Sequence, residues 1–239
     1  MSPKETLQSI LGSKYTTEDE EEFKVVLLPG MALEEIESFK NRMPGKTLPE
    51  DVKELLAFSR GFEFFGLDEV RFDAYEVFGF ESVFPHSIQL AGDGFGNFWI
   101  LDIDSKGNWK SVYYVCHDPA VIVKHSENLS DFIKHVDEFG KQGRSSHLDI
   151  IHEKIVGEIW TEKVGIMQKN EKDYDLSHLL GKLPETFLIG DLSDQPVKAG
   201  FPWALSGPNT KIVRISDEPI WAVEKKVKQG FLSRLFGGK

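Results

Sequence analysis

The chain has 239 residues, of which 40% are hydrophobic and 12% aromatic, so it can bury a sizeable core, and global disorder is disfavoured. Its 39 acidic and 28 basic residues give a formal net charge of −11, which repels a phosphate backbone and argues against nucleic-acid binding. The same charge suits a basic protein partner, such as the nucleic-acid-binding face of a nuclease, although solubility alone also explains an acidic surface.

Residues Met1 to Leu11 lack a basic start followed by a long apolar run, so we expect no signal peptide or membrane anchor. No apolar stretch reaches the length of roughly 18 residues that a membrane span needs. The one cysteine, Cys116, excludes an intramolecular disulfide and a cysteine-based zinc site. These features favour a protein of the reducing cytoplasm.

Residues 1–29 form an acidic lead-in with one predicted strand, at 23–28, which Pro29 and Gly30 end. Apolar residues at spacings of three and four then predict an amphipathic helix over 33–43. A second helix is predicted to begin near Thr47, which would cap it, with Pro49 in the first turn and Gly61 as its end.

From Phe62 the apolar period changes to two, which is typical of strands. Short runs are predicted at 62–65, 70–72 and 75–78, and the clearest strands at 87–91, 97–103 and 109–116. Short loops join the last three strands, so they must pair antiparallel, because a parallel pair needs a long crossover. We expect the sheet to end at 117–119, and a helix from Leu129 to Phe139 to be closed by Gly140.

This order of elements predicts an α+β fold, an antiparallel sheet meander flanked by helices. Residues 30–140 would form the main domain. Residues 141–239 would form a mixed C-terminal appendage of unclear fold, with a helix capped by Ser146 and running to about Val164. A polar linker is expected at 168–175, followed by strands at 186–188, 212–215 and 220–224.

Several patterns resemble chemical sites but fit structural roles better. Asp102 to Gly107 begins like a calcium loop, yet Lys106 would repel the ion, so a hairpin turn is favoured. The glycines of residues 92–96 are followed by a strand and not by the helix that a phosphate loop requires. His147 and His152 would diverge by about 140° around a helix and cannot easily share an ion. We therefore expect no metal, no cofactor and no catalysis, and a buried Cys116 thiol.

The segment Lys225 to Phe236 is basic and carries apolar residues at its end. One interpretation is a docking helix for a partner or an anionic membrane surface. The other is a helix folded onto the acidic body of the protein, or a frayed end.

Six patterns occur in a fixed order within residues 30–140: Leu33-Glu-Glu-Ile36, then Leu48-Pro-Glu-Asp-Val-Lys-Glu-Leu-Leu56, Ser59-Arg-Gly61, the hairpin of 88–102, a strand end from Val112 to Asp118, and the helix at 129–133. This ordered set resembles the SUKH superfamily. Its founding member is a yeast regulator of cell-wall glucan synthesis, and many bacterial members are immunity proteins that neutralise toxins. The acidic lead-in and the last hundred or so residues depart from the family pattern.

The resemblance implies a non-catalytic protein that binds and neutralises a cognate toxin, such as a nuclease. The alternative is an intracellular regulator or scaffold that binds an endogenous protein. In family members the hairpin carries the most recognisable residues, here Asp93, Gly96, Asn97 and Asp102. With Trp99 and Trp109, they are the predicted partner-binding residues. We expect both tryptophans to be exposed anchors, although Trp99 fits a core position equally well.

Overall fold

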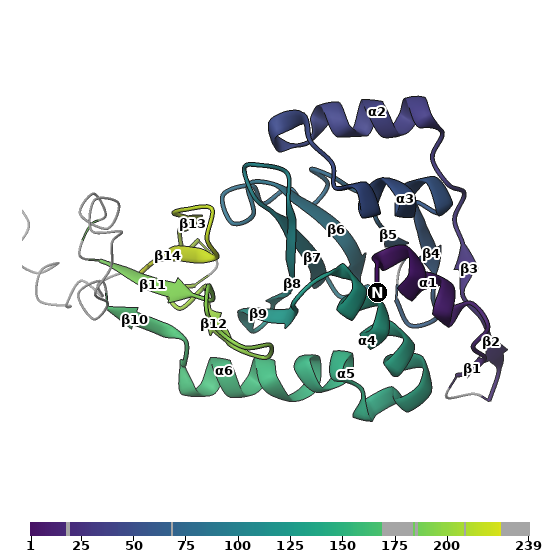
Figure 1. Ribbon diagram of the computed structural model, residues 1–239. Coiled ribbons are helices and arrows are strands. Elements are labelled where there is room, and N and C mark those ends of the chain that lie inside the picture. Colours follow the sequence, from purple (N-terminus) through teal and green to yellow (C-terminus); the bar gives the residue numbers. More distant parts are fainter. Residues whose placement is uncertain (18–19, 68, 169–183, 185, 208, 226–239) are drawn as a thin grey trace, which may run out of the picture.

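The centre of the molecule is a five-stranded antiparallel sheet (Figure 1). The computed structural model describes residues 1–17, 20–67, 69–168, 184, 186–207 and 209–225. The sheet has the order β12 (Gly200–Pro202), β9 (Ala120–Ser126), β8 (Trp109–His117), β7 (Phe98–Ile103) and β6 (Ser87–Gly92). The α+β fold and the predicted meander over 87–116 are thereby confirmed. The expected end of the sheet at 117–119 is wrong, because the chain turns there and returns as β9.

Both faces of this sheet are covered, and its side chains alternate between two apolar layers. Trp99, Leu101 and Tyr114 face a core that they share with the helices. Ile100 and Tyr113 face a second core on the opposite side.

The first core includes residues of α1 (Pro3–Ile10), α2 (Leu33–Arg42), α3 (Glu50–Phe58) and α4 (Leu129–Gln142), together with Leu148, Ile151, Val156 and Ile159 from the helical segment after α4. The helices predicted over 33–43 and 129–139 are confirmed, and α1 is an addition. Ser2 caps α1, since its hydroxyl accepts from the Glu5 N–H and the Glu5 carboxylate accepts from the Ser2 N–H. The predicted Thr47 cap is wrong, because α3 begins at Glu50 and the Thr47 hydroxyl donates to the carbonyl of Lys106.

The lead-in strand predicted at 23–28 is divided between two small sheets. β2 (Glu22–Phe23) pairs with β1 (Tyr15–Thr16), whereas β3 (Val26–Leu27) pairs with β4 (Gly61–Glu63), which in turn pairs with β5 (Val70–Arg71). Gly61 therefore lies in a strand and does not end a helix. A Cβ there would stand 2.1 Å from the Val70 carbonyl oxygen, so glycine permits the close pairing. The run at 75–78 forms only a bridge from Tyr75 to Ile88.

Gly140 lies inside α4, which continues to Gln142, so its predicted role as a helix end is also wrong. A Cβ on Gly140 would lie 2.3 Å from Tyr15 Cδ1 and 2.7 Å from Phe64 Cζ. The glycine instead lets two aromatic rings pack directly against the helix backbone.

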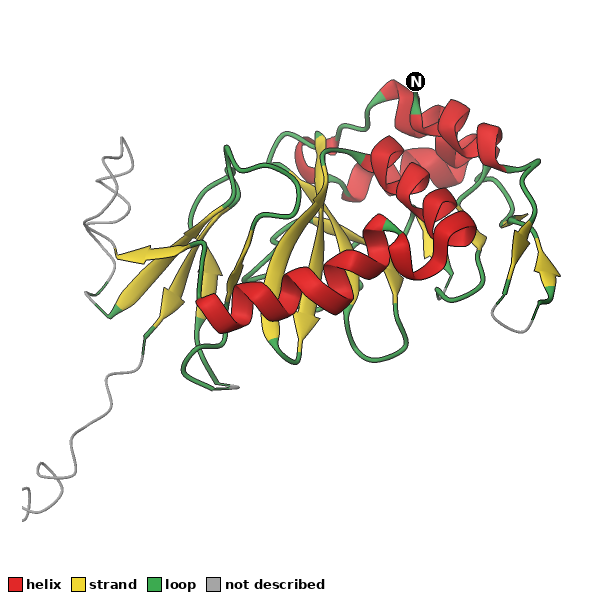
Figure 2. Cartoon of the chain, turned by 90° about the horizontal axis from the view of Figure 1, so that it is seen from below, coloured by secondary structure: helices red, strands yellow, loops and turns green. Residues whose placement is uncertain are grey.

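One short 3-10 turn (Pro44–Lys46) lies between α2 and α3. A second (Gly143–Ser145) follows α4, and the chain then enters one long helix. It consists of α5 (His147–Ile150), a π-helical turn (Ile151–Ile155) and α6 (Val156–Glu162), and Figure 2 shows it lying across the central strands. The Ser146 hydroxyl accepts from the Asp149 N–H, which confirms the predicted cap.

The C-terminal strands form a second sheet in the order β10 (Ile166–Gln168), β11 (Phe187–Asp191), β14 (Ile220–Glu224) and β13 (Ile212–Arg214). Trp221 from β14 is fully buried in the second core, and its indole N–H donates to the Val83 carbonyl at 2.7 Å. β12 also adds the fifth strand to the central sheet. The C-terminal residues are thus joined to the main domain by pairing and by packing.

Within the part of the chain that the structure describes, none of the helices has the length and hydrophobicity of a membrane span. The basic segment Lys225–Phe236, apart from Lys225, and the predicted linker, apart from Gln168, lie outside the described residues.

Candidate protein-binding surface

The turn between β6 and β7 is held by one carboxylate. Asp93 Oδ1 accepts hydrogen bonds from the backbone N–H groups of Phe95 (2.9 Å) and Asn97 (3.1 Å). Its Oδ2 accepts from Asn97 Nδ2 at 2.6 Å and from the Tyr114 hydroxyl at 3.1 Å. Burial raises the pKa of Asp93, but these hydrogen bonds outweigh it and hold the pKa below its usual value. The turn is therefore internally fixed.

The same turn occurs again at the other end of β7. Asp104 accepts from the backbone N–H groups of Lys106 and Asn108 and from Asn108 Nδ2, all within 2.9 Å. Both turns have the pattern Asp-x-x-Gly-Asn, and the glycines, Gly96 and Gly107, have φ near +88° and +83°. The hairpin-turn interpretation of residues 102–107 is therefore confirmed.

Asn97 and Gly96 connect the turn between β6 and β7 to His117, the last residue of β8. The buried Asn97 side chain accepts from the His117 N–H at 3.0 Å, and its Oδ1 lies 2.9 Å from His117 Nδ1. A Cβ on Gly96 would lie 3.3 Å from Cε1 of the same ring. Asp93, Gly96 and Asn97 thus act together to position the tip of the hairpin.

Phe95, at that tip, is 78% exposed. A second phenylalanine, Phe65, is 58% exposed in the loop after β4. Each borders one of two neighbouring hollows, of about 250 Å³ beside Phe95 and about 660 Å³ beside Phe65. The two hollows share the lining residues Phe139, Asp149 and Glu153. We call this region the Phe95 surface.

The hollow beside Phe95 combines aromatic and acidic side chains. Its lining contains no lysine or arginine among the described residues, and consists of Gly66, Leu67, Asp93, Phe95, Trp99, Tyr114, Phe139, Leu148, Asp149, His152 and Glu153. His152 Nδ1 lies 2.7 Å from the Glu153 carboxylate, whereas His147 contacts other histidines. The prediction that His147 and His152 diverge is confirmed.

Neither of the two tryptophans predicted as exposed anchors is fully exposed. Trp99 is 4% exposed and packs against Tyr114 and Phe132, so it belongs to the core and its expected exposure is wrong. Trp109 packs partly buried against the same core, and its Nε1 is buried.

Asp102 makes a buried ion pair with a residue 112 positions away. Arg214 Nη2 donates to Asp102 Oδ2 at 2.8 Å, and the side chains of both residues are about 95% buried. The Arg214 guanidinium also lies over the ring of Trp221, 4.6 Å from its centroid. Asp102 therefore joins the central sheet to the C-terminal sheet and is not available at the surface.

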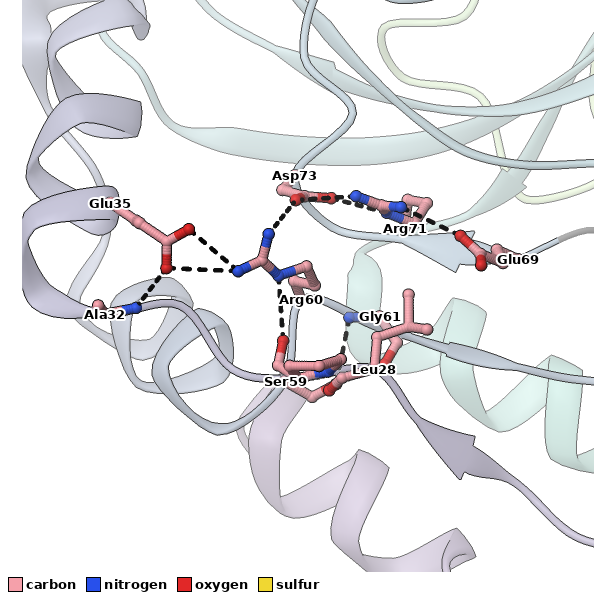
Figure 3. Close-up of polar contacts among 10 residues, drawn as sticks. Leu28, Ala32, Glu35, Ser59, Arg60, Gly61, Glu69, Arg71 and Asp73 are labelled. Atoms are coloured by element: carbon pink, nitrogen blue, oxygen red, sulfur yellow. Dashed lines mark hydrogen bonds and ion pairs between the residues drawn. The ribbon is translucent and has the colours of Figure 1, made fainter.

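The Ser59-Arg60-Gly61 motif is also occupied internally (Figure 3). The Ser59 hydroxyl bonds to Gly61 and donates to the Leu28 carbonyl, while Arg60 donates to the Pro29 carbonyl and to Glu35. The Ala32 N–H and Arg60 hold the pKa of Glu35 below its usual value through their hydrogen bonds. This motif fixes α2 and α3 against the small sheet.

Cys116 is buried, as predicted, and burial raises the pKa of its thiol to about 11. Phe65 and Phe95 were not predicted as surface residues. For Phe95 a signal was present, because an aromatic residue between two turn glycines has no core to fill.

Residues 30–135 match the family model described as the SMI1 / KNR4 family (SUKH-1). No curated protein and no solved structure gave a significant match to the chain.

Proposed function

Because residues 30–135 form a domain that belongs to the SMI1 / KNR4 family (SUKH-1), we propose that the chain is a non-catalytic immunity-type protein that binds and neutralises a cognate toxin. It would act in the cytoplasm and would need no cofactor, because it would block the active site or substrate groove of the toxin by occupying it. The family is one of protein-binding domains, which supports a protein as the partner.

The exposure of Phe95 on a fixed turn is the observation that carries this proposal. The side chain is 78% exposed, while the four hydrogen bonds to Asp93 hold the backbone beneath it. An aromatic anchor that is already positioned loses little conformational entropy on binding, and such anchors supply most of the binding energy of protein interfaces.

The charge of the chain indicates the chemistry of the partner. The net charge is −11, and the hollow beside Phe95 is lined by Asp93, Asp149 and Glu153. A basic surface, such as the face with which a nuclease holds its substrate, would complement it. Complementary charge mainly speeds association, so the association rate should fall steeply as salt is raised.

The test is co-expression with the product of the neighbouring toxin gene. Wild-type chain should protect the cells, and Phe95→Ala should weaken the purified complex by about 30- to 1000-fold in Kd. Leu33→Ala is a matched control, because Leu33 is also 78% exposed but lies on α2. It should leave protection and Kd unchanged, and both variants should keep the wild-type melting temperature.

Unchanged protection by Phe95→Ala would remove the Phe95 surface as the binding site. No complex and no protection with the wild-type chain would remove the immunity function. If the wild-type chain instead captures an endogenous protein from its own cells, and Phe95→Ala does not, the regulator or scaffold alternative replaces it.

A further inference from the structure

Three histidines from three different elements meet beside the central sheet. His125 lies in β9, His135 in α4 and His147 in α5. One ring nitrogen of each lies within 4.8 Å of those of the other two. His125 is fully buried, and the rings of His135 and His147 are stacked with their centroids 3.8 Å apart.

The hydrogen bonds around the cluster leave one nitrogen of each ring without a proton. His147 Nε2 lies 2.8 Å from the His125 carbonyl oxygen, which can only accept, so the lone pair of the neutral His147 ring is at Nδ1. Nδ1 of His125 and Nδ1 of His135 lie 2.8 Å and 3.0 Å from the Ser126 hydroxyl. That oxygen can accept from both, and in the tautomers with both protons at Nδ1 the remaining lone pairs are at Nε2.

The most informative atom is His125 Nε2. It is buried and has no hydrogen-bond partner among the described residues. A buried nitrogen with no partner is costly to the fold unless something else satisfies it. Metal-ligating histidines commonly hold their second nitrogen through a backbone carbonyl or another oxygen, as all three do here.

We propose that His125, His135 and His147 bind a divalent transition-metal ion of the zinc class. Imidazole nitrogen suits Zn²⁺ and its neighbours in the first transition row, whereas Mg²⁺ and Ca²⁺ prefer oxygen ligands. Three histidines leave the fourth tetrahedral position for water.

The site must tighten to hold the ion. Zn–N bonds of about 2.0–2.1 Å in a tetrahedron place the nitrogens about 3.4 Å apart, so nitrogens that now lie within 4.8 Å of one another have to close by up to about 1.4 Å. The stacked rings of His135 and His147, now 17° from parallel, must also rotate apart, because a metal lies near the plane of each imidazole that binds it.

The position of the site gives the ion a structural role. His125 and His135 lie within the family domain of residues 30–135, whereas His147 begins the long helix that follows it. A bound ion would therefore fix the first turn of that helix to the domain. This inference does not depend on the proposed toxin binding.

The test uses the full-length chain, freed of metal with a chelator and then titrated with Zn²⁺. We expect one ion per chain by calorimetry, and a rise of about 5–10 °C in melting temperature at an ion concentration a hundred times Kd. Co²⁺ should give the visible absorption of a four-coordinate centre, and Mg²⁺ should have no effect.

His135→Ala and His147→Ala should weaken Zn²⁺ binding at least 100-fold. His152→Ala is the matched control, because His152 is exposed, contacts Glu153 and should leave the affinity unchanged. In case a variant fails to fold, the ring nitrogen NMR signals of the wild-type chain give an independent measurement. Zn²⁺ should shift the ring nitrogen signals of His125, His135 and His147 and leave the signals of His152 unchanged. No binding by the wild-type chain, or shifts confined to other histidines, would overturn the proposal.

Discussion

Replacing Arg214 with methionine should leave the Asp102 carboxylate buried without its counter-ion. The two side chains are about 95% buried and joined at 2.8 Å, so solvent cannot take the place of the guanidinium. Breaking such a pair by removing one partner costs about 3–5 kcal/mol of unfolding free energy. The carbonyls of residues 216–218 that Arg214 also contacts lie in a partly exposed loop and can bind water instead.

Equilibrium unfolding in urea, followed by tryptophan fluorescence and circular dichroism, measures this loss. With a slope of about 2–3 kcal/mol per molar urea, the midpoint should fall by about 1–2.5 M. Arg42→Met is the control, because the Arg42 side chain is 53% exposed and 3.8 Å from Glu76, and its loss should cost under about 1 kcal/mol.

The loss should also depend on pH. Burial already raises the pKa of Asp102, and Arg214 is the main group that opposes it. In Arg214→Met the folded-state pKa of Asp102 would rise further above that of the unfolded chain, so the variant binds more protons when folded and loses stability as pH rises above the ordinary aspartate pKa of about 4. The double variant Asp102→Leu/Arg214→Met should recover most of the loss. A single variant that loses less than 1 kcal/mol, or a double variant less stable than the single, would refute the reasoning.

Two further predictions concern packing. Gly140→Ala should lower the unfolding free energy by about 1–3 kcal/mol, because the new methyl group would meet the Tyr15 ring. Gly157→Ala in α6 has open space around the new methyl group and should raise the unfolding free energy by about 0.5–1 kcal/mol. Urea midpoints of the two variants that move in the same direction would contradict this. Cys116 should react with iodoacetamide at least 100-fold more slowly in the native chain at pH 8 than in urea, as followed by mass spectrometry. Because the pKa of its thiol is about 11, the native rate should rise with pH up to that value; equal native and unfolded rates would show that the thiol is accessible.

The amphipathic helices and the strands that flank a glycine-rich turn could be predicted from the sequence. α2 and α4 show apolar residues at helical spacing, and the hairpin of β6 and β7 shows strand-type runs around a glycine-rich turn. β9 was missed because all seven of its residues are buried, so no alternation marks it. β12 was missed because three residues that include Pro202 carry no strand signal alone, and pairing with β9 decides their conformation.

The site could be predicted only in part. The turn residues Asp93, Gly96 and Asn97 act locally, so the sequence pattern around them was sufficient. Trp99 was ambiguous because an aromatic strand residue fits either face of a sheet. The partners of Asp102 and His125 are brought to them by the tertiary fold, from 112 and 22 positions away, and no local pattern reports such distances.

The Asp93–Asn97 turn separates the residues that shape the backbone from the residue presented to solvent. Asp93, Gly96 and Asn97 hold the turn, whereas position 95 contributes only its N–H to it. If the proposed binding through Phe95 is right, a substitution at position 95 would change the partner that is bound without loss of folding. Related chains that diversify under selection would be expected to vary there first, while the surrounding frame stays the same.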